Sequence, residues 1–373
     1  MKVKQLKILE FSDIHLGHPN TDTNFILDNL YKEFKNEPEF GEYDIVFIAG
    51  DVFDTLLQLP DPRAMEIKLW IHYFLSLCKK YDVVLRVLEG TPSHEWAQSK
   101  YFTQINEMGK INCDLKYIDT LCIEHIERFD IDVLYVPDEW KPECDDIWQD
   151  VKQLLMEKNL TQVDFSVMHG AFNYQLPSHI PSPTHIPERY LEITKHLIFI
   201  GHIHKHSVND RIVAAGSFDR LTHGEEEPKG FIKAIVRKTG ERRIIFVENE
   251  SAKIYKTIDC DDADLSKTLK RISNIVKKLP DGSNVRIRSH KEHPILTNLD
   301  VIRKKFPNIK FVTKSSKEIL NEGESALKLS QAIYKPIKIT SKNIEGLLKD
   351  RIKNKEQDNT LIDQAMLLIK KYI

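Results

Sequence analysis

Several features that mark common protein classes are missing from this 373-residue sequence. No segment approaches the roughly 18 to 20 consecutive apolar residues of a membrane-spanning helix, and the opening MKVKQLKILEFSD reaches a carboxylate too early for a signal peptide. We therefore expect a cytoplasmic protein without a membrane partner. The five cysteines never occur as CxxC, which favours reduced, structural thiols. The sequence also holds no GxxxxGK[ST] motif, so any ATP binding would belong to another chain.

The composition is typical of a protein with a large folded core. Hydrophobic residues make up 41% of the chain, aromatic residues 9% and charged residues 29%. These values exclude a disordered or collagen-like chain. At roughly 100 to 200 residues per domain, the length predicts two domains.

The formal net charge of −2 conceals two oppositely charged parts of the chain. Residues 251–373 contain 26 Lys and Arg against 15 Asp and Glu, a net charge of +11, which leaves −13 for residues 1–250. An acidic part can hold cations and a basic part can hold polyanions, so this division favours metal chemistry joined to a nucleic-acid surface. A solvated lysine-rich face is the alternative explanation of the basic part.

Short apolar runs alternate with helical stretches in the first 250 residues. The runs are rich in Val and Ile, which is typical of buried strands, and the stretches between them repeat apolar residues at helical spacing. This pattern predicts an α/β unit over residues 1–250, closed by a meander of strands after residue 210. The predicted strands cover 6–11, 44–48, 83–88, 133–136, 165–168 and 197–200, and the predicted helices cover 22–36, 62–80 and 146–158.

The basic part divides further. Residues 251–320 predict a small α+β domain with three strands and two helices. Residues 321–340 resemble a linker. Residues 341–373 place apolar side chains at i, i+3 and i+4 in two amphipathic helices that have little core of their own to join.

Asp and His residues follow five of the predicted strands. Open α/β sheets bind ligands at the carboxyl ends of their strands. A single histidine is more often a core or surface residue than a ligand. Here a purely structural role would have to be assumed separately for each of five motifs, so we favour a ligand role. The five motifs are Asp13-Ile14-His15, Gly50-Asp51-Val52-Phe53-Asp54, Gly90-Thr91-Pro92-Ser93-His94-Glu95, His169-Gly170 and Gly201-His202-Ile203-His204.

These motifs offer oxygen and imidazole donors without a thiolate, a set that suits Mn²⁺, Fe²⁺, Zn²⁺ or Mg²⁺. Seven or eight such donors exceed what one ion takes. Two ions about 3.5 to 4 Å apart, bridged by a carboxylate, would activate water and stabilise both the attacking and the leaving oxygen of a phosphoester. We expect two divalent ions. Mn²⁺ is the expected ion because histidines suit a softer ion than Mg²⁺, with Mg²⁺ as the alternative.

Taken in order, the five motifs resemble the signature of calcineurin-like metallophosphoesterases over roughly residues 6–220. Within that superfamily, the stretch Asp13-Ile14-His15-Leu16-Gly17 is similar to the opening motif of SbcD nuclease subunits, and the stretch Gly216-Ser217-Phe218-Asp219-Arg220 is similar to the segment that closes their nuclease domain. The whole layout resembles the phage-type recombination endonuclease subunits of that group. The resemblance implies an α/β fold: a four-layer sandwich of two mixed β-sheets flanked by helices, with a small α+β cap domain and C-terminal helices.

The resemblance also implies a role for each site residue. Asp51 would bridge the two ions, and His94 would contact the phosphate and protonate the leaving oxygen. The family usually has an asparagine ligand where this chain has Ser93, so the Ser93 hydroxyl or a water would substitute. Asp54 is expected beside the site or at a helix start rather than as a ligand. The implied ligands are Asp13, His15, Asp51 and His204 for the first ion, and Asp51, Ser93, His169 and His202 for the second.

The activity implied by the resemblance is that of a DNA nuclease, a 3′–5′ exonuclease and endonuclease in DNA end processing and recombination. Its implied partner is an SbcC-like coiled-coil ATPase that grips the terminal helices. The sequence itself shows only amphipathic helices, which could equally form a homodimer. Candidate DNA contacts are His18, just past the first motif, and the cluster Arg303, Lys304, Lys305 and Lys310.

The same fold also permits other activities. A metallophosphoesterase could act on small phosphoesters or phosphoproteins, or the chain could be a catalytically weak scaffold. The basic residues 251–373 favour a nuclease, because a small-ester hydrolase has no evident use for them. The nearly complete ligand set argues against a scaffold, and Ser93 alone favours one.

Overall fold

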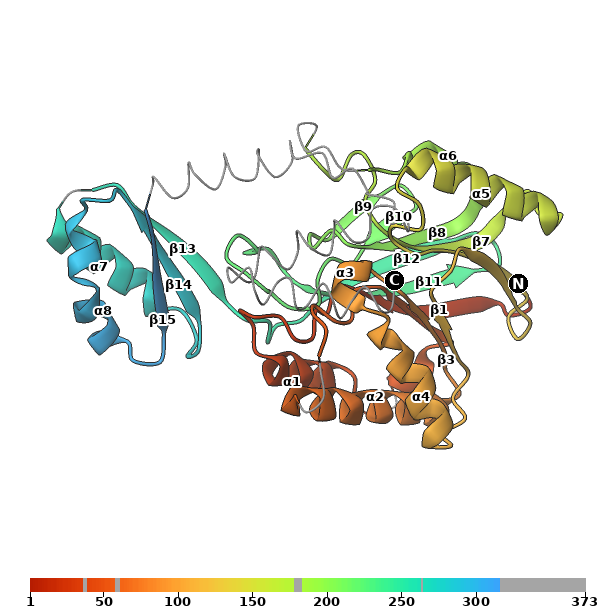
Figure 1. Ribbon diagram of the computed structural model, residues 1–373, viewed down its shortest axis with the longest axis horizontal. Coiled ribbons are helices and arrows are strands. Elements are labelled where there is room, and N and C mark those ends of the chain that lie inside the picture. Colours follow the sequence, from red (N-terminus) through yellow and green to blue (C-terminus); the bar gives the residue numbers. More distant parts are fainter. Residues whose placement is uncertain (36–38, 58–60, 178–182, 263, 316–373) are drawn as a thin grey trace, which may run out of the picture. The chain divides into compact units, whose positions relative to one another are not determined.

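The computed structural model describes residues 1–35, 39–57, 61–177, 183–262 and 264–315. Within these ranges the chain forms two six-stranded sheets and one three-stranded sheet (Figure 1). Among the described residues, no helix combines the length and the apolar character needed to cross a membrane. The five cysteines form no disulfide.

The first sheet has the strand order β12–β11–β1–β2–β3–β4. The strands β1 to β4 run parallel to one another, whereas β11 is antiparallel to β1 and β12 is antiparallel to β11. The helices α1 (Thr23–Glu33), α2 (Pro62–Tyr81) and α4 (Tyr101–Met108) cover one face of this sheet (Figure 1). The strands are β1 (Gln5–Phe11), β2 (Ile45–Ala49), β3 (Val84–Leu88), β4 (Leu115–Ile118), β11 (Gly230–Arg237) and β12 (Arg242–Glu248).

The second sheet has the strand order β5–β6–β7–β8–β10–β9 and is also mixed, with parallel strands at its centre and an antiparallel strand at each edge. The helices α5 (Cys144–Glu157) and α6 (Pro187–Ile193) cover its outer face. The strands are β5 (Cys122–Ile126), β6 (Ile131–Val136), β7 (Val163–His169), β8 (Thr194–Gly201), β9 (Ser207–Asn209) and β10 (Ile212–Ala214).

Side-chain alternation along the strands explains why four layers stack. In β1, Leu9 and Phe11 join the cluster under α1 and α2, whereas Leu6 and Ile8 join the cluster between the two sheets. Successive side chains of a strand point to opposite faces, so a strand that is apolar on both faces needs cover on both. Phe47 of β2 meets Phe199 of β8 across the two sheets, with ring centroids 5.8 Å apart. The four-layer α/β sandwich implied by the resemblance is therefore confirmed.

The elements that the sequence analysis missed are short or only partly apolar. Strand β4 has one buried residue among four, and β5 has two among five. Helices α4 and α6 are only 8 and 7 residues long. Such segments carry little periodic signal, and their structure depends on the layers against which they pack.

The third sheet is the centre of a small unit in which β13, β14 and β15 are parallel and lie in chain order, with a helix between successive strands. This arrangement is α/β, whereas the sequence predicts α+β, because the apolar pattern shows the elements but not the direction in which the strands pair. The core of this unit packs Ile258, Val285 and Ile287 against Ile272 of α7 and Ile302 of α8. The elements are β13 (Tyr255–Cys260), α7 (Leu265–Val276), β14 (Asn284–Ser289), α8 (Leu299–Lys305) and β15 (Lys310–Ser315).

The domain limits at residues 250, 320 and 340 stay predictions. Residues 321–373, for which we predict a linker and two partner-binding helices, lie outside the described residues.

Candidate metal centre

The loops that follow β1 and β2 continue side by side beyond the ends of the strands. The amide of Asp13 donates to the Gly50 carbonyl at 3.1 Å, and the amide of His15 donates to the Asp51 carbonyl at 3.0 Å. These bonds hold the first two motifs in register at one edge of the sheet. The Asp51 carboxylate is thereby placed 3.6 Å from the His15 side chain, as the position of the motifs at the strand ends predicts.

Several residues of these loops adopt a backbone conformation that L-amino acids rarely take. The φ angle is 51° at Asp13, 53° at His15, 51° at Asp51 and 94° at His202. Each left-handed residue costs on the order of 1 kcal/mol, and such conformations persist where the surrounding structure fixes them, often at functional sites. Four left-handed residues in these loops indicate that the backbone is held in an unfavourable conformation in order to place their side chains.

The described residues contain three groups of side chains whose donor atoms all lie within 4.8 Å of one another. Two of the groups consist of residues that the resemblance implies as ligands, one group for each ion. The third group places His94 next to Asp51. The groups are Asp13, His15 and His204; Asp51, His169 and His202; and His15, Asp51 and His94. The structure thus brings the predicted residues together, while their binding of metal stays a prediction.

Asp51 is the centre of this cluster. Its side chain is 2% exposed, and its Oδ1 accepts a hydrogen bond from the Thr91 amide at 2.7 Å. Its Oδ2 faces three imidazole nitrogens: His94 Nδ1 at 3.2 Å, His169 Nε2 at 3.4 Å and His15 Nε2 at 3.6 Å. One carboxylate oxygen therefore contacts residues from three different strand ends.

Hydrogen bonds on the far side of two rings fix which nitrogen faces the cluster. His169 Nδ1 donates to the Ala49 carbonyl at 2.6 Å, and His204 Nδ1 lies 3.0 Å from Glu225 Oε1. Outer partners of this kind orient metal-binding histidines and set their tautomer. His169 Nε2 is buried and has no hydrogen-bond partner, while His204 Nε2 lies 3.0 Å from His15 Nε2. Converging imidazole lone pairs beside carboxylates fit a divalent cation.

The charges of the cluster shift its pKa values strongly. Burial alone would raise the pKa of Asp51, but His169, His94 and His15 outweigh it and hold that pKa well below its usual value. Burial alone would lower the pKa of His169, yet the Asp51 carboxylate raises it to about 10. Burial also opposes the charge of Glu225, and His204 and Lys229 nevertheless lower its pKa to about 2. The Asp51 and Glu225 carboxylates are thus held ionised, and a divalent cation would take the place of the proton on His169.

Three glycines let the loops approach closely enough to form the cluster. A Cβ on Gly50 would lie 2.2 Å from His169 Nδ1, and a Cβ on Gly201 would lie 2.2 Å from the Ala49 carbonyl oxygen. A Cβ on Gly90 would lie 2.2 Å from the Asp51 amide nitrogen and 2.3 Å from its Oδ1. No side chain fits at these distances, so the glycines of the second, third and fifth motifs are steric requirements.

The third motif is arranged differently from the sequence expectation. Ser93 is exposed on the short helix α3 (Pro92–Glu95), where the resemblance implies a ligand. Thr91 instead faces the cluster: its Oγ1 lies 3.3 Å from Asp51 Oδ2, 3.4 Å from His202 Nδ1 and 2.9 Å from Asp138 Oδ2. His94 is 41% exposed, so it can reach a molecule outside the cluster.

Further residues of the motifs and of distant loops lie around the cluster. Asp54 Oδ1 lies 3.1 Å from His15 Nδ1, in keeping with the expected place beside the site. Buried Glu95 accepts hydrogen bonds from the Val52 amide and from Ser99 Oγ, and so ties the second motif to the third. Sequence reasoning missed the contacts of Glu225 and Asp138, since they arise only when distant loops fold together. His18 is half-buried beside the first motif.

The predicted DNA contacts lie on α8 and β15 of the small third-sheet unit. Arg303, Lys304, Lys305 and Lys310 are all exposed. Arg303 pairs with Asp300 at 3.2 Å, and Lys305 Nζ donates to Ser273 Oγ at 3.2 Å. Contact with DNA stays a prediction.

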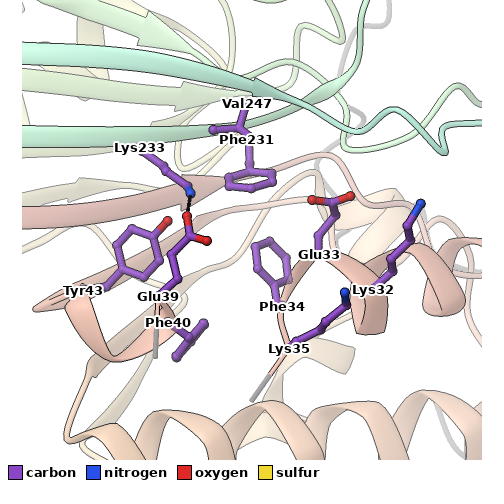
Figure 2. Close-up of a pocket in the computed structure, with 10 residues that line it drawn as sticks. All are labelled: Lys32, Glu33, Phe34, Lys35, Glu39, Phe40, Tyr43, Phe231, Lys233 and Val247. Carbon is purple, nitrogen blue, oxygen red and sulfur yellow. Dashed lines mark hydrogen bonds and ion pairs between the residues drawn. The ribbon is translucent and has the colours of Figure 1, made fainter. Parts of the chain in front are cut away.

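A surface pocket of about 300 Å³ lies between the end of α1 and strands β11 and β12 (Figure 2). Its lining includes Phe34, Tyr43 and Phe231, and its rim carries the ion pair between Lys233 and Glu39. None of the Asp and His residues of the cluster lines it, so we assign the chemistry to the cluster and not to this pocket.

Comparison with known families agrees with this geometry. Residues 6–206 match the family described as calcineurin-like phosphoesterase, which is more than half of the 373 residues. The matched region runs from β1 past His204 and contains all five motifs. No curated protein matches the chain.

Two solved structures are similar to the chain at low sequence identity. TT1561 of Thermus thermophilus has a TM-score of 0.38 and 12% sequence identity, covering 65% of this chain and 98% of its own. MurG of Acinetobacter baumannii has a TM-score of 0.15 and 9% identity, covering 65% and 62%.

We predict that Gly90→Ala weakens cation binding, because the added methyl group must displace Asp51. The affinity for Mn²⁺, measured by isothermal titration calorimetry, should fall at least about 10-fold, as expected when the shell around a metal ligand is disturbed. Gly240→Ala is the control: a Cβ there meets nothing within 4 Å, and the positive φ of Gly240 makes the change a backbone strain at the turn between β11 and β12, at the end of the sheet away from Asp13. Unchanged Mn²⁺ binding by Gly90→Ala would show that the close approach of Gly90 and Asp51 is not needed.

Proposed function

The chain belongs to the calcineurin-like phosphoesterase family, and from this premise we propose that it hydrolyses DNA phosphodiesters as the nuclease subunit of an SbcCD-like complex. Family membership indicates a metal-dependent phosphoesterase. The proposal adds the substrate, two ions and a partner. The observation that carries it is the Asp51-centred cluster, in which the buried Asp51 carboxylate belongs to one group of candidate ligands and lies 3.6 Å from His15 of the other.

In this proposal each side chain of the cluster has a defined task. Two divalent ions, Mn²⁺ in our proposal, would supply the Lewis acidity that activates water and neutralises the phosphate. Asp51 would serve both ions. Glu225 keeps His204 in one orientation, and the Ala49 carbonyl does the same for His169. The first ion would be held by Asp13, His15, Asp51 and His204, and the second by Asp51, His169 and His202, which lie in the groups found in the structure.

His94 differs from the other histidines in a way that suits contact with substrate. His15 and His169 are fully or almost fully buried, whereas His94 is 41% exposed on α3. Its Nδ1 lies 3.2 Å from Asp51 Oδ2, which orients the ring and leaves Nε2 to face outward. A positioned imidazole of this kind can donate a proton to the leaving oxygen of the phosphodiester.

The charge of the chain supports DNA over a small phosphoester. Residues 251–373 carry a net charge of +11, and Arg303, Lys304 and Lys305 stand exposed on one turn of α8. Phosphate contacts from Lys and Arg supply most of the non-specific affinity for DNA. Such a surface has no evident use in binding a small ester.

The proposed partner is an SbcC-like coiled-coil ATPase. The 373 residues contain no P-loop sequence, so ATP would have to be bound by another chain. The amphipathic pattern of residues 341–373 supports a helical docking segment for that chain. A homodimer formed through the same segment is the alternative.

We predict that His94→Ala retains its metal ions and loses most of its activity. Cleavage of end-labelled linear DNA in Mn²⁺ should fall by about 10² to 10⁴, the usual contribution of general acid catalysis, while the number of Mn²⁺ bound per chain stays the same. His125→Ala is a matched control, because His125 is 40% exposed and lies 2.9 Å from an aspartate, Asp132. Cleavage by His94→Ala at the rate of the control would refute the assigned role.

We predict that replacing Arg303, Lys304 and Lys305 together by Gln weakens DNA binding whatever the sequence of the DNA. Each lost phosphate contact should reduce the slope of log affinity against log salt by about 0.9, which fluorescence anisotropy over a range of salt concentrations measures.

The control for this variant replaces Lys79, Lys80 and Lys110, which are exposed cations of the first 250 residues. An equal loss of affinity in both triple variants would point to a general effect of net charge and would contradict a DNA surface on α8.

A further inference from the structure

A buried lysine lies behind the first group of ligands. The Lys229 side chain is 1% exposed, and the residue directly precedes β11. Its Nζ donates to the His204 carbonyl at 2.7 Å and to Glu227 Oε1 at 2.9 Å, and it lies 3.4 Å from Glu225 Oε2. A buried charge is costly unless polar groups surround it, and these three oxygens match the three N–H donors of a lysine. Lys229 is therefore tied both to His204 and to the loop that carries Glu225.

His204 depends on contacts from outside its own segment. Strand β8 ends at Gly201 and strand β9 begins at Ser207, so the pairing of strands does not hold the residues between them. The His204 carbonyl accepts two hydrogen bonds from later parts of the chain, one from Lys229 Nζ and one from the Ser217 amide at 3.1 Å. The lysine thus holds the main chain of an implied metal ligand.

Lys229 also contacts the partner of the His204 ring. Glu225 Oε1 lies 3.0 Å from His204 Nδ1, while Glu225 Oε2 accepts a hydrogen bond from the Leu221 amide at 3.0 Å and faces Lys229 Nζ. Since its two oxygens are held by different partners, the carboxylate cannot turn away from the ring without losing a contact. A histidine whose Nδ1–H is held in this way presents the lone pair of Nε2 to a cation.

The direction of Nε2 agrees with this role. His204 Nε2 lies 3.0 Å from His15 Nε2, and both rings belong to the first group of ligands, with Asp13. The side chain of Lys229 is on the opposite side of the ring, where it contacts the carbonyl and the carboxylate behind His204. One lysine therefore acts on both the main chain and the ring of the same residue.

We propose that Lys229 is a positioning residue of the first cation site, which holds the His204 carbonyl directly and the His204 imidazole through Glu225. The inference rests on the two-ion site of the proposed function. An ion pair with a purely structural role would contribute to folding stability alone. The positioning role also requires that loss of Lys229 weakens the binding of one ion and not the other.

The test is the number and affinity of Mn²⁺ ions bound per chain, measured without DNA by electron paramagnetic resonance of free Mn²⁺. The wild-type chain should bind two ions. Lys229→Met keeps a long side chain and removes its charge, so one ion should be bound at least about 10-fold more weakly and the other as before. Lys229→Arg keeps the charge and should weaken that ion less.

The matched control is Lys233→Met. Lys233 lies on β11, is 26% exposed and forms an ion pair with Glu39. It lines the pocket of Figure 2, to which no Asp or His residue of the cluster contributes. Both Mn²⁺ affinities of this variant should equal those of the wild-type chain.

A double-mutant cycle tests whether Lys229 acts through Glu225. Lys229→Met and Glu225→Gln disturb the same support of the His204 ring, so the loss of affinity in the double variant should be smaller than the product of the two separate losses. Circular dichroism shows whether each variant is folded. The double variant removes both charges of the pair, and it should bind one ion at least about 10-fold more weakly even if Lys229→Met alone does not fold.

The proposal is overturned if Lys229→Met or the double variant binds both ions with wild-type affinity, if both ions are weakened equally, or if the two separate losses multiply. A wild-type chain that binds fewer than two ions would contradict the two-ion premise itself. This outcome is seen in the wild-type chain alone and is distinct from a loss confined to the variants.

Discussion

The rest of the site depends on one buried carboxylate. Asp51 is almost completely shielded from water and is surrounded by His15, His94 and His169. A lone carboxylate in this position would be strongly destabilised, and it remains ionised because positive charge surrounds it. The converging strand ends, the glycines that allow close approach and the left-handed backbone at Asp13, His15 and Asp51 all serve to bring these groups together.

The four-layer sandwich explains how the chain tolerates this arrangement. Loops at strand ends are held by two sheets whose faces are covered by helices, so the strain in four left-handed residues is supported by a large packed core. Contacts behind the histidines hold the imidazole rings in place. Glu225 lies behind His204, the Ala49 carbonyl behind His169 and Asp54 behind His15. A site held in this way would need little rearrangement to bind the cations and the phosphate of the proposed function.

Features that depend on a local sequence pattern, such as strands and motifs, could be predicted from the sequence. Contacts between loops far apart in the chain could not. The buried strands β1, β2, β3 and β8 are short and rich in Val, Ile and Leu, and Asp or His lies in the segment after each of them, so both the sheet and its functional edge could be predicted. Thr91 and Asp138 belong to loops 47 residues apart, and nothing in either loop alone indicates their contact. The resemblance directed attention to Ser93 because it lies next to His94, whereas the turn before α3 presents Thr91 to Asp51.

The central claim is that Asp51 joins two cation sites into one centre. The most direct measurement is the electron paramagnetic resonance spectrum of the chain loaded with two equivalents of Mn²⁺. Two ions that share a carboxylate are magnetically coupled, so the account predicts the multiline spectrum of a coupled Mn²⁺ pair. A spectrum containing only the six-line signal of isolated Mn²⁺ at full loading would contradict it.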